Sequence, residues 1–347
     1  MEEKVNMLDL LLRPAFCVRN GQIFQVNREA TQYCISEGTA IADLLLTGRE
    51  EYATFEGDCL CLTLQLAGQE VAASVIEQDD HHIFILEQDA FQAHLQSMAL
   101  VAQELRDPLA GMMAAADRMQ STAASTDMAQ MNRRLYQMLR MVSNMSDAAR
   151  LMGAKHTAEW LDIDALISEI FAKSAPLAEQ SGKTLRYTGW KERIYTLAND
   201  QLIERAVYNL ISNAMKYSPR GSVIEAKLVK TGKHIRFTIE DQGSGIDTDI
   251  QGNLFSRYMR PAGLEDPSHG LGLGLLMVRM AASTHGGTVL IDHPHGTGTR
   301  VTMTIAIRQD AQTTLRSPRL RIDYASERDH ALLELSDALD PVVYQNI

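Results

Sequence analysis

Apolar residues recur in alternating steps of four and three along two stretches of the chain, which the polar segment Ser121–Asp127 separates. The first stretch carries Phe91, Leu95, Met98, Ala102, Leu105, Leu109, Met112, Ala116 and Met119, and the second carries Met128, Met131, Leu135, Met138, Val142, Met145, Ala149 and Met152. This spacing is typical of helices that pack as a coiled coil, so we predict an antiparallel helical hairpin over residues 91–155. Because one hairpin cannot bury so long a stripe, we expect a homodimer through residues 91–152, as a four-helix bundle. A hairpin packed against its own chain is the alternative.

Residues 1–90 alternate short apolar runs with turn signals. Runs at 16–19 and 23–26 flank Asn20-Gly21, which is a strong tight-hairpin signal. A helical stretch over 27–46 precedes three more strand-like runs at 60–66, 71–77 and 83–86. A hairpin, short helices and a three-strand meander in this order are similar to a PAS sensor domain. An unspecified α+β domain is the alternative, and the sequence names no ligand for either.

Residues 156–307 mix helices and strands. Helices are expected near 163–180, 200–217 and 273–284, and strands near 223–229, 235–240, 288–292 and 299–307. Residues 308–347 form an appendage of unassigned role, with a candidate strand at 320–324 and a capping-box sequence at 326–329 before a helix that stops at Pro341. The chain is therefore predicted to be a multidomain α+β protein divided into 1–90, 91–155, 156–307 and 308–347.

Charge is concentrated in the first part of the chain. The net charge is −11 over 347 residues, and residues 1–90 hold 16 acidic and 5 basic side chains, which leaves the remainder neutral. Without a basic patch, we expect neither nucleic acid nor anionic membrane as a partner. No apolar run is long enough for a membrane span and the acidic start does not resemble a signal peptide, so we expect no membrane insertion and a cytoplasmic location. The four cysteines match no zinc-site spacing and are expected to be buried thiols.

The first candidate for chemistry is a helix face. Asn209, Asn213 and Lys216 are separated by four and three residues, so one helix presents two amides and an ammonium on the same side. An amide oxygen suits Mg²⁺ bound beside phosphates, and the ammonium suits a phosphate charge. A solvated helix face has the same pattern, so this motif alone does not identify a site.

Two glycine-rich turns follow. Asp241 comes directly after a strand, and Gly243 and Gly245 let the backbone approach a ligand while the carboxylate accepts a hydrogen bond from an adenine amino group. A second run, Gly270 to Gly274, opens an apolar helix whose amide-rich end favours phosphates. Residues 259–269 between them are expected to form a lid, with Arg257 and Arg260 at its base.

Taken in order, these motifs resemble the catalytic region of bacterial sensor histidine kinases, within the GHKL ATPase superfamily, over about residues 88–307. Residues 209–216 match the N box, 241–245 the G1 box, 254–258 the F box and 270–274 the G2 box. The resemblance implies a GHKL-type α/β sandwich that binds ATP and Mg²⁺, with Asn213 as the metal ligand, Asp241 as the adenine contact, and Lys216 and Asn209 near the phosphates. The implied ATP-binding set is Asn209, Asn213, Lys216, Asp241, Gly243, Gly245, Arg257, Arg260, Gly270, Gly272, Gly274 and Thr299.

The chain departs from this family at the phosphoacceptor. The family motif His-Glu-Leu-Arg-x-Pro-Leu reads here from Gln103-Glu104 to Pro108-Leu109, with glutamine in place of histidine. An amide nitrogen is not a nucleophile, because its lone pair is delocalised, so we expect no self-phosphorylation at this position. Asp107 replaces the family's water-orienting Thr or Asn, and its charge would oppose a phosphatase step on a phosphoryl group.

Three functions remain open at this point. The first is a pseudokinase: an ATP-binding, dimeric signalling protein that regulates a partner, such as a response regulator or a partner kinase. The second is a kinase that phosphorylates a histidine on another chain or a different acceptor residue. The third is a GHKL ATPase of another type, which Asn209 disfavours because such enzymes commonly carry a water-activating glutamate at that position.

Overall fold

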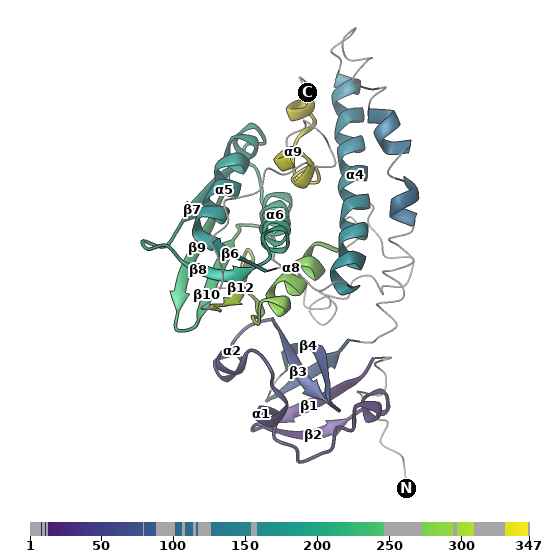
Figure 1. The fold of residues 1–347 in the computed structure, drawn as a ribbon, viewed down its shortest axis with the longest axis vertical. Coiled ribbons are helices and arrows are strands. Elements are labelled where there is room, and N and C mark those ends of the chain that lie inside the picture. Colours follow the sequence, from purple (N-terminus) through teal and green to yellow (C-terminus); the bar gives the residue numbers. More distant parts are fainter. Residues whose placement is uncertain are drawn as a thin grey trace.

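The computed structural model describes residues 8, 11, 13–78, 80–87, 101–105, 108–113, 116, 126–153, 158–245, 273–293, 297–308 and 330–345, with side chains to residue 146 in the segment 126–153. Figure 1 shows a small β-rich part at the bottom, which we call the front module (residues 13–87). The larger α/β part lies above it, with the long helix α4 at its side.

The front module is a five-stranded antiparallel sheet with short helices between its second and third strands. Its elements are β1 (Ala15–Arg19), β2 (Gln22–Val26), η2 (Arg28–Tyr33), α1 (Ile41–Leu44), α2 (Arg49–Ala53), β3 (Cys59–Leu66), β4 (Gln69–Gln78) and β5 (His81–Leu86). The expected β1–β2 hairpin is confirmed, because Asn20 and Gly21 both take positive φ, 51° and 76°, as a tight primed turn requires. Cys17, Cys59 and Cys61 are buried as expected, but Cys34 is exposed.

The α/β part contains every helix and strand expected between residues 160 and 307, and three more strands. These elements are β6 (Glu159–Asp162), α5 (Ile163–Gln180), β7 (Thr184–Thr188), β8 (Tyr195–Ala198), α6 (Asp200–Tyr217), β9 (Val223–Thr231), β10 (His234–Glu240), α8 (Leu273–Thr284), β11 (Val289–Asp292) and β12 (Arg300–Ala306). The additional strands β6, β7 and β8 were not predicted, because they are short and none of them carries a strong apolar run.

The sheet of the front module and the sheet of the α/β part join edge to edge. Together they form one ten-stranded sheet, in the order β2-β1-β5-β4-β3-β11-β12-β10-β9-β7. At the junction β3 runs antiparallel to β11, with Cys61 opposite Val289 and Cys59 opposite Ile291. The pairing covers the main-chain groups of both strands, which an open sheet edge would leave exposed. Nothing in the pattern of either strand predicted this junction.

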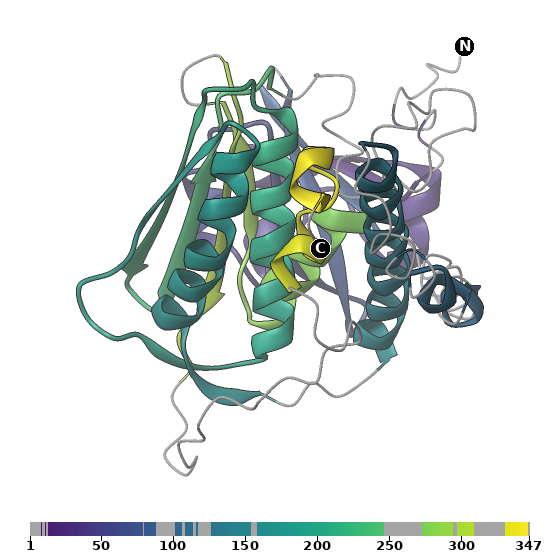
Figure 2. The same cartoon turned by 90° about the horizontal axis from the view of Figure 1, so that it is seen from above.

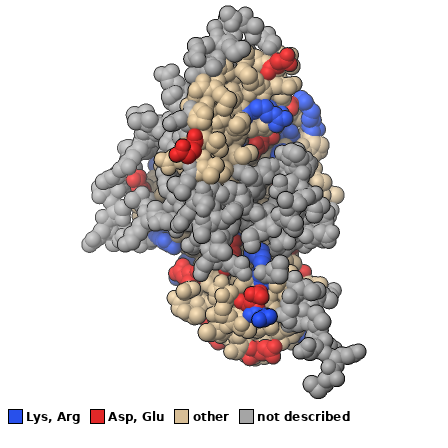
Figure 3. Space-filling model, turned by 90° about the vertical axis from the view of Figure 1, so that its right-hand side faces the viewer, with Lys and Arg blue, Asp and Glu red and all other residues tan. Residues whose placement is uncertain are grey.

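The two hairpin helices leave four of the described positions of the predicted stripe exposed. On the first, residues 101–105, 108–113 and 116 are helical, with Ala102 and Leu109 buried while Leu105 and Met112 remain 42% and 46% exposed. On α4 (Thr126–Gly153) Leu135, Val142 and Met145 are buried, whereas Met131 and Met138 are exposed. Figure 3 views the molecule from the side on which α4 lies, and most of the described residues seen there are neither basic nor acidic. The single chain therefore buries part of the stripe and leaves Leu105, Met112, Met131 and Met138 exposed.

The C-terminal segment (residues 330–345) packs into the molecule. It forms α9 (His330–Glu334), a turn and η5 (Pro341–Tyr344), so the helix expected to run to Pro341 is shorter than predicted. The expected strand at 320–324 and the capping box at 326–329 lie outside the described residues. Figures 1 and 2 both place α9 between α4 and α6. No helix within the described residues is long and apolar enough to cross a bilayer.

Candidate functional site

Asp241 lies directly after β10 and organises the turn that follows. Its Oδ1 accepts hydrogen bonds from the backbone N–H of Gly243 at 2.8 Å and of Thr299 at 3.2 Å. In the described part of the chain no donor contacts Oδ2, so one carboxylate oxygen is held by the fold and the other is available to a ligand. Burial raises the pKa of Asp241 above its ordinary value, and the two backbone hydrogen bonds partly offset that rise.

Close backbone contacts surround this carboxylate. A Cβ on Gly243 would lie 2.7 Å from the carbonyl oxygen of Tyr217, at the end of α6. A Cβ on Gly298 would overlap the carbonyl oxygen of Asp241, and Gly298 also has a φ of +81°. The Asp241 turn, the end of α6 and the turn before β12 thus meet at distances that only glycine permits.

Helix α6 carries the predicted amide pair and lysine. Asn213 and Lys216 are half-buried, whereas Asn209 is 1% exposed. The start of α8 packs against the same helix, since a Cβ on Gly274 would lie 3.2 Å from Oδ1 of Asn209. The structure therefore brings Asn209 and Gly274 together on one side of α6, and Asp241, Gly243 and Thr299 together at its C-terminal end.

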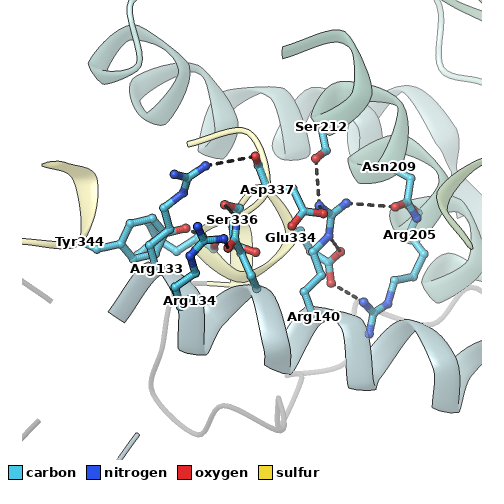
Figure 4. Close-up of polar contacts among 12 residues, drawn as sticks. Arg133, Arg134, Arg140, Arg205, Asn209, Ser212, Glu334, Ser336, Asp337 and Tyr344 are labelled. Carbon is cyan, nitrogen blue, oxygen red and sulfur yellow. Dashed lines mark hydrogen bonds and ion pairs between the residues drawn. The ribbon is translucent and has the colours of Figure 1, made fainter. Parts of the chain in front are cut away.

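Asn209 is held by a residue from the hairpin. Arg140 of α4 is 4% exposed, and its Nη2 donates to Oδ1 of Asn209 at 3.0 Å while its Nη1 donates to Oγ of Ser212 at 2.9 Å. The Nδ2 of Asn209 donates to the carbonyl oxygen of Arg205 at 2.9 Å. Figure 4 shows Arg140 reaching from α4 to both α6 side chains. The amide that was expected to face phosphates is thus hydrogen-bonded to an arginine of the same chain.

The His285-Gly286-Gly287 sequence has a structural role. Nδ1 of His285 donates to the carbonyl oxygen of Ala281 at 2.6 Å, and Nε2 accepts from the backbone N–H of Asn199 at 2.9 Å. Asn199 is the N-cap of α6, and its side chain accepts from the N–H of Leu202. The neutral imidazole therefore connects the end of α8 to the start of α6.

The front module reaches the Asp241 turn through a side-chain pair. Nδ1 of His293, at the end of β11, contacts the carboxylate of Asp58, which precedes β3. A Cβ on Gly245 would lie 2.9 Å from the His293 ring, so this ring stacks over the turn. The sequence carries no signal that pairs His293 with Asp58.

The remaining predicted residues fall into two groups. Gln103 and Glu104 are exposed on the first hairpin helix, and no described contact joins them to the Asp241 turn. Arg257, Arg260, Gly270 and Gly272 lie outside the described residues, together with the expected lid and the F box. Sequence reasoning missed Arg140 and Arg205, which contact Asn209, and Glu334, which faces both arginines. Each of the three reads as an ordinary charged position on a helix surface.

Comparison with known proteins places the site within a family. Residues 198–309 match the family described as histidine kinase-, DNA gyrase B- and HSP90-like ATPase. The chain is 27% identical over 284 residues to the sensor-like histidine kinase SenX3 of Mycobacterium tuberculosis, which covers 75% of this chain and 68% of that protein. It is 30% identical over 131 residues to the sensor histidine kinase YvrG of Bacillus subtilis, covering 38% of this chain and 22% of YvrG.

The fold is also similar to a solved structure, that of full-length ShkA in complex with AMPPNP. The TM-score is 0.51 with 21% sequence identity, over 62% of this chain and 46% of ShkA. The chain therefore spans about half the length of that protein. At this identity the likeness concerns the fold alone.

Proposed function

Because the chain belongs to the bacterial sensor histidine kinase family, we propose that it binds Mg-ATP and acts in two-component signalling as a regulator. In this proposal it does not phosphorylate itself at the family's usual position. The fold is mixed α+β with an ATPase domain of the histidine kinase type.

The observation that carries the ATP proposal is the fixed carboxylate of Asp241. Two backbone N–H groups hold its Oδ1, so Oδ2 keeps one orientation without further ordering when a ligand arrives. An ionised carboxylate accepts hydrogen bonds only, so it selects a ligand with an exposed donor, such as the amino group of adenine. Arg257, Arg260, Gly270 and Gly272 complete the proposed ATP-binding set by resemblance.

A magnesium ion accompanies ATP in this proposal, and the amide oxygens of α6 are of the kind it binds. Asn213 fits that role, since its side chain is half-buried and carries a neutral hard oxygen. Asn209 does not fit it in this conformation, because its Oδ1 accepts from the cationic Arg140. Lys216, three residues after Asn213, would meet a phosphate.

The proposed loss of self-phosphorylation rests on Gln103. The residue is exposed on its helix, as an acceptor has to be, but its amide has no nucleophilic lone pair. The neighbouring Glu104 cannot replace the missing imidazole as the acceptor. Phosphoryl transfer, if it occurs, must therefore use an acceptor elsewhere.

We further propose a homodimer through residues 91–152 and a PAS-like front module. The exposed part of the hairpin stripe supports the dimer, because Leu105, Met112, Met131 and Met138 are apolar side chains that a second hairpin would cover. The order of hairpin, short helices and three-strand meander supports the PAS-like assignment. A response regulator or a partner kinase is the proposed downstream partner.

Nucleotide-binding calorimetry beside a phosphorylation assay tests this function. The wild type should bind ATP in the presence of Mg²⁺, Asp241→Asn should lose most of that affinity, and Asp43→Asn, an exposed aspartate of the front module, should keep it. Labelled ATP should leave no acid-labile phosphate on the purified protein. Labelling of the wild type would overturn the pseudokinase proposal, and equal binding by Asp241→Asn would overturn the site.

A kinase that acts on another chain is the second candidate. The same exposed hairpin face would accept a homologous hairpin that carries a histidine where this chain has Gln103. Co-purification with a homologous kinase, followed by ATP-dependent labelling of that partner alone, would favour it. A GHKL ATPase of another type is the weakest candidate, because Asn209 replaces the water-activating glutamate and is occupied by Arg140.

A further inference from the structure

The C-terminal segment is packed between two helices that belong to different parts of the chain. It lies between α4 of the hairpin and α6 of the ATPase domain (Figures 1 and 2). Its apolar side chains belong to the same core as both helices and are buried: Ala331, Leu332, Leu333, Leu335, Leu339 and Tyr344. The side chains of this segment thus pack between α4 and α6.

A buried carboxylate joins the three elements. Glu334 of α9 is 0% exposed, and its Oε1 forms an ion pair with Arg205 of α6. Its Oε2 lies 3.8 Å from Nε of Arg140, the α4 residue that also donates to Asn209. Asp337, half-exposed, accepts from Nη1 of Arg140 at 2.7 Å. Figure 4 shows the two arginines converging on Glu334 from opposite helices.

Further contacts attach the segment along both sides. On α4, Tyr136 packs on Tyr344 with ring centroids 5.2 Å apart, and Nε2 of Gln137 donates to the carbonyl oxygen of Ser336 at 3.2 Å. At the other side, Arg220 forms an ion pair with Asp340 at 3.1 Å. The segment therefore bridges the hairpin and the ATPase domain over its whole length.

This arrangement has a consequence for Asn209. Arg140 can hold Oδ1 of Asn209 only while α4 lies against α6, and Glu334 with Asp337 supplies the negative charge that lets an arginine be buried there. Arg140 occupies Oδ1 of Asn209, the atom of this side chain that a magnesium ion accompanying the nucleotide would need. Nucleotide binding and the packed C-terminal segment thus compete for one residue.

We propose that residues 330–345 form an intramolecular clamp that holds the ATPase domain against α4 and lowers its affinity for nucleotide through Arg140 and Asn209. The proposal rests on the ATP-binding function proposed above. The facing surfaces of α4 and α6 are thus covered by a segment of the same chain. Release of this segment is the step that frees Asn209 from Arg140.

Substitutions in the clamp test its effect on affinity. Glu334→Gln and Arg140→Gln should each bind AMPPNP with Mg²⁺ at least about fivefold more tightly than the wild type, which is the lower end of typical coupling between sites. Arg186→Gln is the matched control, because Arg186 is exposed on β7 and pairs with the exposed Glu225 at 3.7 Å. Unchanged or weaker binding in both clamp variants, with binding in the wild type, overturns the clamp.

A measurement on the wild type avoids any folding defect of the variants. Coupling between two sites is reciprocal, so saturating AMPPNP should increase deuterium uptake in residues 330–345 and in residues 132–140 of α4. Unchanged or lower uptake with nucleotide bound would overturn the clamp while leaving ATP binding in place. If the wild type, Glu334→Gln and Arg140→Gln all fail to bind nucleotide, the proposed ATP function fails and the clamp's effect on affinity with it.

Discussion

Neutralising Glu334 should destabilise the protein far more than neutralising an exposed glutamate. In Glu334→Gln the side chain keeps its shape, but Arg140 and Arg205 lose a carboxylate that is completely buried. Removing one partner of a buried ion pair typically costs ~3–5 kcal/mol, because the remaining charge stays desolvated. We expect about 3 kcal/mol, the lower end, because Oε2 lies 3.8 Å from Arg140 and Asp337 still neutralises that arginine.

The control for this substitution is Glu169→Gln. Glu169 forms an i,i+4 ion pair with Lys173 at 2.6 Å on the exposed face of α5, a kind of pair worth roughly 0.3–0.5 kcal/mol. Urea denaturation followed by circular dichroism gives both free energies of unfolding, and an unchanged slope with denaturant shows that the same surface unfolds. A loss below about 1 kcal/mol for Glu334→Gln, or one equal to the control, would refute the reasoning that the carboxylate balances buried arginines.

Three further outcomes are expected. Burial raises the pKa of Asp241 above its ordinary 3.8. As the pH is lowered, ATP affinity should therefore begin to fall at a higher pH than it would with an ordinary carboxylate, because acid protonates Oδ2. Calorimetry across pH should show that Asp241→Asn lacks this pH-dependent loss of affinity. Gly298→Ala should cost more stability than Gly221→Ala in urea denaturation, because both glycines have positive φ but only Gly298 has a carbonyl oxygen in the way; equal losses would contradict this. Met138→Glu should convert the proposed dimer to monomer in sedimentation, and Lys230→Glu, a charge reversal at an exposed position of β9, should not.

Local patterns predicted the elements well. Asn20-Gly21 forms the expected hairpin turn because two positive φ angles suit these two residues, whatever surrounds them. The motif around Asp241 likewise lies at a strand end, as its position after an apolar run indicates. The spacing of Asn209 and Lys216 placed them on one helix for the same reason.

The long-range contacts of Arg140 and Glu334 beside the proposed nucleotide site could not be predicted from the sequence. Arg140 lies within an ordinary hairpin helix, and a charge there is normally solvated; it is buried because a segment almost two hundred residues later in the chain covers it. Glu334 follows the apolar pair Leu332-Leu333 and has no sequence feature that marks it as buried. Long-range pairing of this kind depends on how the folded helices and strands pack against one another, which neither hydrophobic periodicity nor local propensity encodes.

Within the described residues, the attachments of the ATPase domain to the front module and to α4 differ physically. At the front module the attachment is a main-chain ladder between β3 and β11, supported by the buried ion pair of Arg279 with Glu87. Main-chain groups of a paired strand have no alternative partner until the strands separate, so single side-chain changes there should have limited effect. At α4 the attachment passes through the side chains of Arg140 and Glu334, so its strength follows individual residues. The attachment at α4 also holds a residue of the proposed nucleotide site, because Arg140 donates to Asn209.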